Sequence, residues 1–163
     1  MGSNNIEEVF TNIYKNNTWS SIESASGTGS EIAATKEIRE RLPELIQNYE
    51  IKNVLDIGCG DFNWMKTIVH HIGYYVGVDT VAAIIEKNTR LYGTDNIAFL
   101  HKNILDLDWE FYSAFDAVIL KDVLVHLSFK NITKILTQLK LSRIKYLFAT
   151  SFLGCPINRD IPD

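Results

Sequence analysis

The sequence predicts an α/β fold in which about five parallel strands form a doubly wound sheet, with helices on both faces and a helical segment at the N-terminus. Three observations predict this class. Short apolar runs alternate with segments of helical periodicity, which is typical of βαβ units. One run ends in a turn that contains two glycines, and the next run ends in an aspartate. The length of 163 residues suits one domain with a full core.

The N-terminal third contains helical patterns on either side of a polar loop. Apolar side chains recur on one face of residues 5–15, which predicts a short helix. Residues 16–30, "NNTWSSIESASGTGS", are polar and rich in glycine and serine, which predicts a loop. Ser30 is a candidate N-cap for a helix over 31–48, which Pro43 is expected to kink or split.

Five apolar runs predict the strands, and segments of helical periodicity connect most of them. The strands are "NVLDI" at 53–57, "YYVGVD" at 74–79, "IAFLH" at 97–101, "FDAVIL" at 115–120 and "KYLFAT" at 145–150. The helices are expected at 62–71, 81–92 and 129–141, with Ser128 as the cap of the last one.

Charge and cysteine content argue against several function classes. The net charge of -4 gives no support for nucleic-acid binding, which usually needs a basic surface. No apolar stretch approaches the roughly 20 residues that span a bilayer, and the polar N-terminus lacks the apolar region of a signal peptide. We therefore expect no association with a membrane. Cys59 and Cys155 are far apart and lack metal-site spacing, so we expect no metal site and a reduced, cytoplasmic setting.

The turn after the first strand suits a ligand that approaches the backbone closely. The strand ends at Asp56, and Gly58 and Gly60 permit backbone angles that other residues avoid. A pyrophosphate is a weaker candidate, because Asn63 stands where the dinucleotide-binding turn has its third glycine. Asp56 and Asp61 would also repel phosphate, whereas they suit a ligand with a cationic part.

The acid at the end of the second strand indicates a ribose. Asp79 occupies the position from which a carboxylate accepts hydrogen bonds from a ribose diol in dinucleotide-binding folds. The alternative is that Asp79 only caps the helix that follows. A ligand with a ribose, a cationic part and no phosphate is S-adenosyl-L-methionine.

The ordered segments "VLDIGCGDFNW", "YVGVD", "NILDLD" and "FDAVILKDVLVHLS" resemble the motifs of class I S-adenosylmethionine-dependent methyltransferases, over roughly residues 52–150. The resemblance implies a Rossmann-like sheet and methyl transfer. A narrower set, "TWSSIESASGTGSE", "GDFNWM", "LKDVLVHLSF", "ATSF" and "NRDI", is similar to small bacterial methyltransferases of surface-polysaccharide gene clusters. These include enzymes linked to the O-methyl phosphoramidate group of Campylobacter capsules.

The resemblance implies a set of cofactor-binding positions near the strand ends, together with a loop residue. These positions are Asp56, Gly58, Cys59, Gly60, Asp79, Thr80, Asn103, Ile104, Lys121 and Trp19. The first strand's turn would face the methionine end, and Asp79 would hold the ribose hydroxyls. Asn103 would lie at the adenine edge, where the family often has an acid. Cys59 is expected to be a small packed residue and not a nucleophile. The loop around Trp19 would fold over the cofactor as a lid, or it is a surface linker.

The resemblance places Lys121 and Asp122 at the methyl-transfer centre, and His126 follows Asp122 by four residues. In a helix, Asp122 and His126 would share a face, so the acid would orient the imidazole as a base for a hydroxyl acceptor. Alternatively, Asp122 pairs with Lys121 and His126 is structural. An anionic acceptor would need no base but cationic partners instead, for which Lys121, His126 and Arg159 are candidates.

The end of the sequence indicates a shortened form of this fold. We expect one domain over 1–163, with N-terminal helices and a lid loop at 1–50, the cofactor-binding core at 51–150 and a shortened tail at 151–163. The usual C-terminal β-hairpin would be missing, so the exposed sheet edge could pair two copies of the chain. Two functions remain: O-methylation of a small, anionic, phosphorylated or phosphoramidate-bearing capsule precursor, and a catalytically impaired cofactor-binding or interaction module. A nicotinamide-dependent enzyme is a weaker alternative.

Overall fold

A five-stranded sheet forms the centre of the computed structural model, which describes residues 3–152, 154 and 157–161. The strands are β1 (Asn53–Ile57), β2 (Tyr74–Asp79), β3 (Ile97–His101), β4 (Ala117–Leu120) and β5 (Tyr146–Ala149). Their spatial order is β3-β2-β1-β4-β5, and all four neighbouring pairs are parallel. The predicted doubly wound class is confirmed, and so are the five predicted strands.

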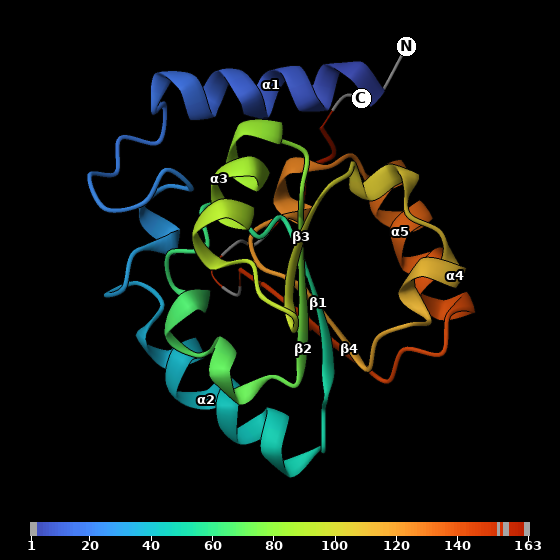
Figure 1. Cartoon of the computed structure of the whole chain (residues 1–163). Helices are drawn as coiled ribbons and strands as arrows, with labels where there is room; N and C mark the ends of the chain where they lie inside the picture. The colour runs from blue at the N-terminus through green and yellow to red at the C-terminus, as the bar shows by residue number, and fades with distance from the viewer. Residues whose placement is uncertain (1–2, 153, 155–156, 162–163) are drawn as a thin grey trace.

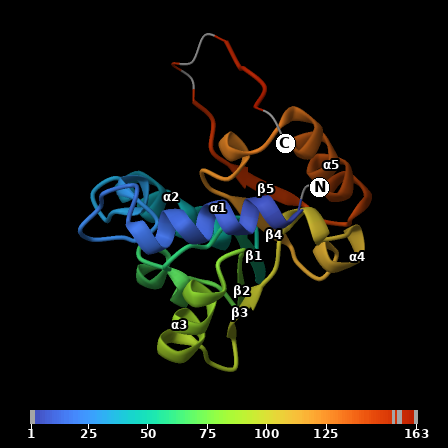
Figure 2. The same ribbon diagram turned by 90° about the horizontal axis from the view of Figure 1, so that it is seen from above.

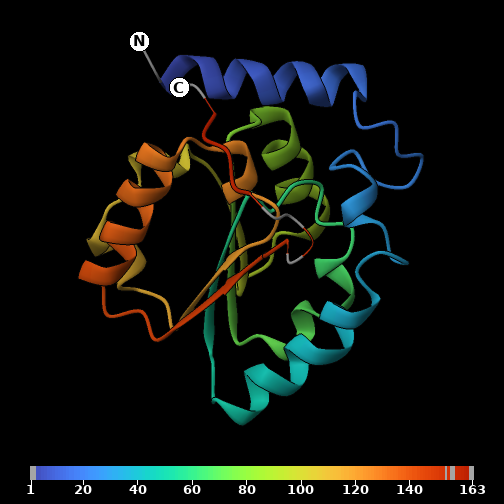
Figure 3. The ribbon, with the colours of Figure 1, turned by 180° about the vertical axis from the view of Figure 1, so that it is seen from behind.

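Five α-helices lie around this sheet in the described part of the chain. They are α1 (Ser3–Asn16), α2 (Lys36–Asn48), α3 (Ala82–Tyr92), α4 (Trp109–Tyr112) and α5 (Phe129–Leu141). Figure 1 shows α2 and α3 on one face of the sheet, α4 and α5 on the other, and α1 across one end. The view from behind shows the same division (Figure 3). None of the helices in the described part of the chain is long and apolar enough to cross a membrane.

Alternating side chains of the strands build two apolar clusters, one on each face. On one face, Val54 and Tyr75 pack in a cluster with Ile46 of α2. On the other face, Leu55 packs in a cluster with Ile135 of α5. Because strands buried on both faces need apolar residues at nearly every position, the continuous apolar runs of the sequence are explained.

The predicted helix over 31–48 begins later than expected. Helix α2 starts at Lys36, and Ser30 does not cap it but ends a short 3₁₀ helix. The backbone N–H of Ile32 donates instead to Glu23 Oε1 at 2.7 Å. This bond to the preceding loop replaces the helical start that the sequence suggested.

The prediction of one α-helix over 62–71 is wrong. The segment forms two 3₁₀ helices, Met65–Thr67 and Val69–His71. Phe62 has a φ of 61°, outside the helical region, and Ile68 separates the two turns with a φ of -125°. An α-helix therefore cannot begin at Phe62 or continue through Ile68.

Two expectations fall wholly or partly outside the described residues. Cys155 is one, and the tail over 151–163 is the other, because 153, 155–156 and 162–163 are not described. Strand β5 is the last strand of the described part of the chain.

The order of the strands creates a switch point between β1 and β4. From β1 the chain moves outward to β2 and β3, and then returns to the opposite side for β4 and β5. The view from above shows α1 lying over this region of the sheet (Figure 2). Ligands of open α/β sheets bind beyond the carboxyl ends of the strands at such a point.

Candidate active site

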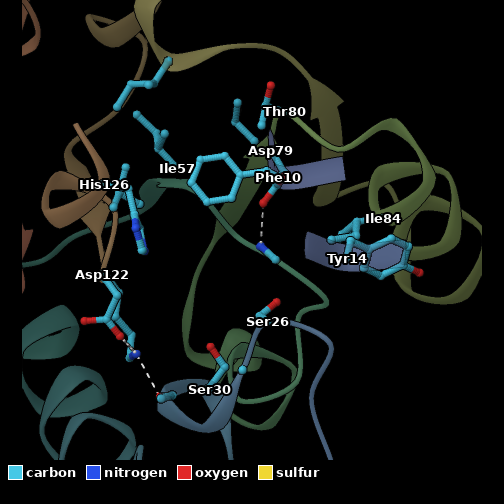
Figure 4. Close-up of a pocket in the computed structure, with 18 of the residues that line it drawn as sticks. Phe10, Tyr14, Ser26, Ser30, Ile57, Asp79, Thr80, Ile84, Asp122 and His126 are labelled. Atoms are coloured by element: carbon cyan, nitrogen blue, oxygen red, sulfur yellow. Dashed lines mark hydrogen bonds and ion pairs between the residues drawn. The ribbon is translucent and has the colours of Figure 1, made fainter. Parts of the chain in front are cut away.

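A cavity of about 320 Å³ opens at the carboxyl ends of β1 and β2, beside the segment that follows β4. The strand ends supply its floor, and residues 25–30 and Trp19 supply one side. Helix α1 contributes Phe10 and Tyr14, and Figure 4 draws Tyr14 beside Ile84 among the residues that line the cavity. The cavity has the size of a small-molecule site and the position that the doubly wound topology predicts.

The glycine turn forms part of this cavity and is fixed from several sides. Gly58 and Gly60 both line it, with φ values of 72° and 54°. A Cβ on Gly58 would lie 2.5 Å from Val123 Cγ2, and a Cβ on Gly60 would collide with Ser26 Oγ. The Gly60 carbonyl accepts a hydrogen bond of 2.8 Å from Asn88 Nδ2. Only glycine fits both positions, as the sequence indicated.

Asp79 and Thr80 line the cavity beside the glycine turn, as expected. The Asp79 carboxylate accepts hydrogen bonds from the N–H groups of Gly60 at 3.0 Å and Val81 at 2.9 Å. Burial raises the pKa of Asp79, while these backbone hydrogen bonds oppose the rise. Val81 is the residue before α3, and this helix has no side-chain cap, so Asp79 does not act as the helix cap that was the alternative. Thr80 Oγ1 is one of three buried polar atoms without a hydrogen-bond partner among the described residues.

Asp56 and Cys59 lie beneath the turn, and neither is among the residues that line the cavity. This differs from the expected place of the Asp56 side chain at the methionine end, whereas Cys59 was expected to be a small packed residue and is one. Asp56 is 2% exposed and accepts a hydrogen bond of 2.7 Å from the Tyr75 hydroxyl. Burial is the main cause that raises the pKa of Asp56 to about 7. Cys59 is buried in the core, and burial raises the pKa of its thiol well above the usual range. The Cys59 thiol donates to the Gly60 carbonyl at 3.7 Å.

Asn103 and Ile104 form the far end of the cavity, after β3. Asn103 Oδ1 accepts a hydrogen bond of 2.9 Å from the Leu105 N–H and so caps the short helix η4 (Ile104–Asp106). Both residues therefore lie at the cavity, and their expected place at the adenine edge stays a prediction.

Lys121, Asp122 and His126 all line the cavity, but not in the expected helix. Asp122 has a left-handed φ of 58°, and His126 ends the 3₁₀ helix η5 (Leu124–His126). The two therefore do not share a face of an α-helix, and this expectation is wrong. Instead, Lys121 Nζ donates to Asp122 Oδ2 at 2.5 Å and to the Gly29 carbonyl at 2.9 Å. The alternative pairing of Asp122 with Lys121 is thus the one observed.

His126 lies in an aromatic group that includes Phe10 and Trp19. Its ring stacks on Trp19 with centroids 6.0 Å apart, and it meets Phe10 edge-on at 5.4 Å. Burial lowers the pKa of His126, and the nearby charge of Asp122 opposes this effect. Burial therefore favours the neutral form of the imidazole beside the cavity. The stacking also brings Trp19 from the N-terminal loop to the cavity, in keeping with its assignment to the site.

Sequence reasoning missed two parts of this site. The apolar face of the N-terminal helix was predicted, but not that Phe10 and Tyr14 would line the cavity. Asp61 was considered only for its charge, which would repel phosphate and suit a cation, although its carboxylate bonds the loop that carries Trp19. The serine-rich composition of that loop was the available signal, since hydroxyls are donors for a carboxylate. In the described part of the chain, no group of three His, Cys, Asp or Glu side chains could hold a metal ion.

The sequence over residues 54–141, more than half of the chain, matches the family model described as methyltransferase domain. Among curated proteins, none matches the chain.

Several solved structures share the fold. The methyltransferase domain of bacterial CtHen1-C has a TM-score of 0.60 at 17% identity, with 71% of this chain and 64% of that chain covered. The complex of DhpI with SAH has a TM-score of 0.63 at 13% identity, with coverage of 95% and 72%. Phosphoethanolamine N-methyltransferase 1 of Haemonchus contortus, with phosphoethanolamine and S-adenosylhomocysteine, has a TM-score of 0.60 at 18% identity, with coverage of 88% and 31%. The chain thus spans less than two thirds of the length of the first of these similar structures, the CtHen1-C domain.

Proposed function

Because this chain belongs to the family of methyltransferase domains, we propose that it binds S-adenosylmethionine in the cavity and transfers the methyl group to a small acceptor. The observation that carries the proposal is the glycine turn at the switch point, which faces a cavity next to the acid that ends β2. Two of the similar structures are complexes with SAH or S-adenosylhomocysteine, which agrees with this assignment.

The side chains present fit such a cofactor. Each Asp79 oxygen accepts one backbone hydrogen bond and keeps acceptor capacity for a ribose diol. Thr80 Oγ1 is buried at the cavity without a partner among the described residues, and a ligand could supply one. Gly58 and Gly60 leave backbone exposed to the cavity, where the methionine end would lie. Asn103 and the segment after it would border the adenine.

The residues around the cavity can supply alignment, water exclusion and a base. Bound S-adenosylmethionine would supply an electrophilic methyl group on a sulfonium. Phe10, Trp19 and His126 cover the cavity with aromatic rings, which would exclude water from the reacting groups. Most of the rate enhancement would come from holding the acceptor in line with the methyl group. A neutral His126 could accept the proton of a hydroxyl acceptor, because burial keeps the pKa of its imidazole low.

The acceptor that we propose is small and carries a hydroxyl or phosphoryl oxygen. Lys121 places an ammonium group at the cavity, although Asp122 balances its charge. An anionic oxygen that displaced the Asp122 carboxylate would find a cationic partner there. The segments similar to surface-polysaccharide enzymes support a phosphorylated or phosphoramidate-bearing capsule precursor, handled in the cytoplasm. The second candidate is a module that holds the cofactor without turnover.

The edge of the sheet is our candidate for self-association. Strand β5 pairs only with β4 among the described strands, and Leu147 on it is 41% exposed. An open edge with an exposed apolar side chain favours pairing with another chain. Sedimentation over a range of concentrations tests this, because a strictly monomeric protein would contradict it.

Two measurements on the purified chain test the proposed function. Titration calorimetry with S-adenosylhomocysteine asks whether the cavity binds the cofactor product. Mass spectrometry of candidate acceptor pools, incubated with the chain and methyl-labelled cofactor, asks whether a methyl group is transferred. Binding with transfer supports the enzyme, and binding without transfer to any pool supports the cofactor-holding module. No binding at millimolar ligand would refute both candidates.

A further inference from the structure

Asp61, next to the glycine turn, bonds a segment that lies far before it in the sequence. Its Oδ1 accepts hydrogen bonds from Ser24 Oγ at 2.9 Å and Ser26 Oγ at 3.2 Å. Its Oδ2 accepts from the N–H of Ala25 at 2.7 Å, and its own N–H donates to Ser26 Oγ at 2.9 Å. One residue thus gathers three consecutive residues of the N-terminal loop against the turn.

The segment held in this way continues directly into the wall of the cavity. Residues 25–30 all line the cavity. Two other side chains hold the far end of the same wall: Asn63 Nδ2 donates to the Ser30 carbonyl at 3.1 Å, and Lys121 Nζ donates to the Gly29 carbonyl at 2.9 Å. Asp61 therefore fixes the start of a wall whose end is fixed elsewhere.

We propose that Asp61 is a positioning residue whose carboxylate keeps the loop wall closed on the glycine turn before the cofactor binds. The inference rests on the proposed function, because the wall is expected to contact the cofactor. A flexible loop would have to be ordered on binding, and the apparent affinity falls with the fraction of molecules already in the competent form. A loop fixed in advance avoids that loss.

The chemistry of the site requires a carboxylate at this position. Two hydroxyls and one backbone N–H of the loop point their donors at Asp61. A carboxylate has only acceptors, whereas an amide would turn one NH₂ group toward these donors. The hydroxyls of Ser24 and Ser26 could rotate to accept from it, but each carboxylate oxygen also accepts from a backbone N–H that cannot turn: Ala25 on Oδ2, and Asn63 on Oδ1 at 3.4 Å. Asp61→Asn therefore keeps the shape of the side chain and breaks the pattern of bonds.

The test compares Asp61→Asn with a matched control, Asp95→Asn. Asp95 is exposed in the turn before β3, away from the cavity lining, and its replacement removes the same charge. Hydrogen exchange of ligand-free protein, followed over residues 19–30, reports on the closure of the loop. Calorimetry with S-adenosylhomocysteine reports on affinity. We expect faster exchange and about 10- to 100-fold weaker binding for Asp61→Asn only, with a smaller loss of turnover at saturating cofactor.

A second variant keeps the test decisive if Asp61→Asn does not fold. Ser24→Ala removes one donor to Asp61 and leaves the charge in place, so smaller changes in the same direction are expected. Unchanged exchange over residues 19–30 in both variants would overturn the proposal, and so would faster exchange without any loss of affinity. If the unaltered chain does not bind S-adenosylhomocysteine, the proposed function fails, whereas the exchange measurement needs no ligand and still decides whether Asp61 holds the loop.

Discussion

Replacement of Asp56 by asparagine should remove a pH-dependent destabilisation of the fold. The carboxyl is 2% exposed, and Tyr75 donates its only hydrogen bond among the described residues. Burial and the charge of Asp79 raise the pKa of Asp56 from 3.8 to about 7, although the Tyr75 hydroxyl and the charge of Lys121 oppose the rise. In the unfolded chain the same carboxyl should titrate near its ordinary pKa of about 3.9.

The sign of the effect follows from which state binds the proton more tightly. The folded state does so, and therefore ionisation of Asp56 opposes folding. As the pH rises from about 4 to about 7, its contribution should lower the free energy of unfolding, and above about pH 7 the contribution should be constant. The difference between the two pKa values corresponds to a decrease of about 4 kcal/mol in the free energy of unfolding. Asparagine does not ionise, so the variant should lack this loss.

Urea unfolding of both proteins between about pH 4 and about pH 8 measures the effect. The free energy of unfolding of Asp56→Asn minus that of the unaltered chain should increase by about 4 kcal/mol across this interval and then level off. Tyr75→Phe is the complementary variant. It removes the hydrogen bond that stabilises the charged carboxylate, so its loss of stability should extend to higher pH. A difference that stays constant with pH would refute a buried Asp56 that takes up a proton in the folded state.

Three further replacements test the site. Asp79→Ala should weaken S-adenosylhomocysteine binding by about 1–3 kcal/mol, because polar partners lose their acceptor; unchanged affinity in calorimetry would remove Asp79 from the site. His126→Ala should lower the rate of methyl transfer far more than cofactor affinity, and equal losses in kcat and affinity would show a structural role. Gly60→Ala should lower the free energy of unfolding by about 1–2 kcal/mol, because alanine would have to adopt the left-handed backbone of Gly60; thermal unfolding measures this loss. The same variant should weaken cofactor binding by displacing Ser26. Adding Ser26→Gly should restore some of the affinity but not the backbone cost, and a fully stable Gly60→Ala would contradict both statements.

The sheet and the glycine turn could be predicted because their signals are local. A strand buried on both faces must be apolar along its length, and "NVLDI" and "YYVGVD" show this directly. The left-handed φ angles at Gly58 and Gly60 are a property of the turn alone, so the residue type reveals them. The position of Asp79 at the cavity then follows from parallel pairing, which aligns the ends of β1 and β2.

The acceptor side could not be predicted in the same way. A spacing of four residues suggested a helical pair of Asp122 and His126, but the chain turns through a left-handed residue at Asp122 before the short helix begins. A distant segment contributes to that turn, because the Asp122 N–H donates to Thr150 Oγ1 at 2.9 Å, while the carboxylate bonds the neighbouring Lys121. Sequence spacing gives no sign of partners that lie 28 residues away.

The three acids around the glycine turn show why charge alone was an incomplete guide to this site. Their presence suggested a ligand with a cationic part, yet each carboxylate also accepts hydrogen bonds from other parts of the protein. Asp56 receives the Tyr75 hydroxyl from below, Asp79 receives the Gly60 N–H from the neighbouring strand, and Asp61 receives the loop donors from above. Each lies beside the same few backbone atoms, so their combined charge still favours a cation in the cavity. The two roles are separable by experiment: added salt should weaken the long-range attraction, whereas replacement of a single acid should move the turn itself.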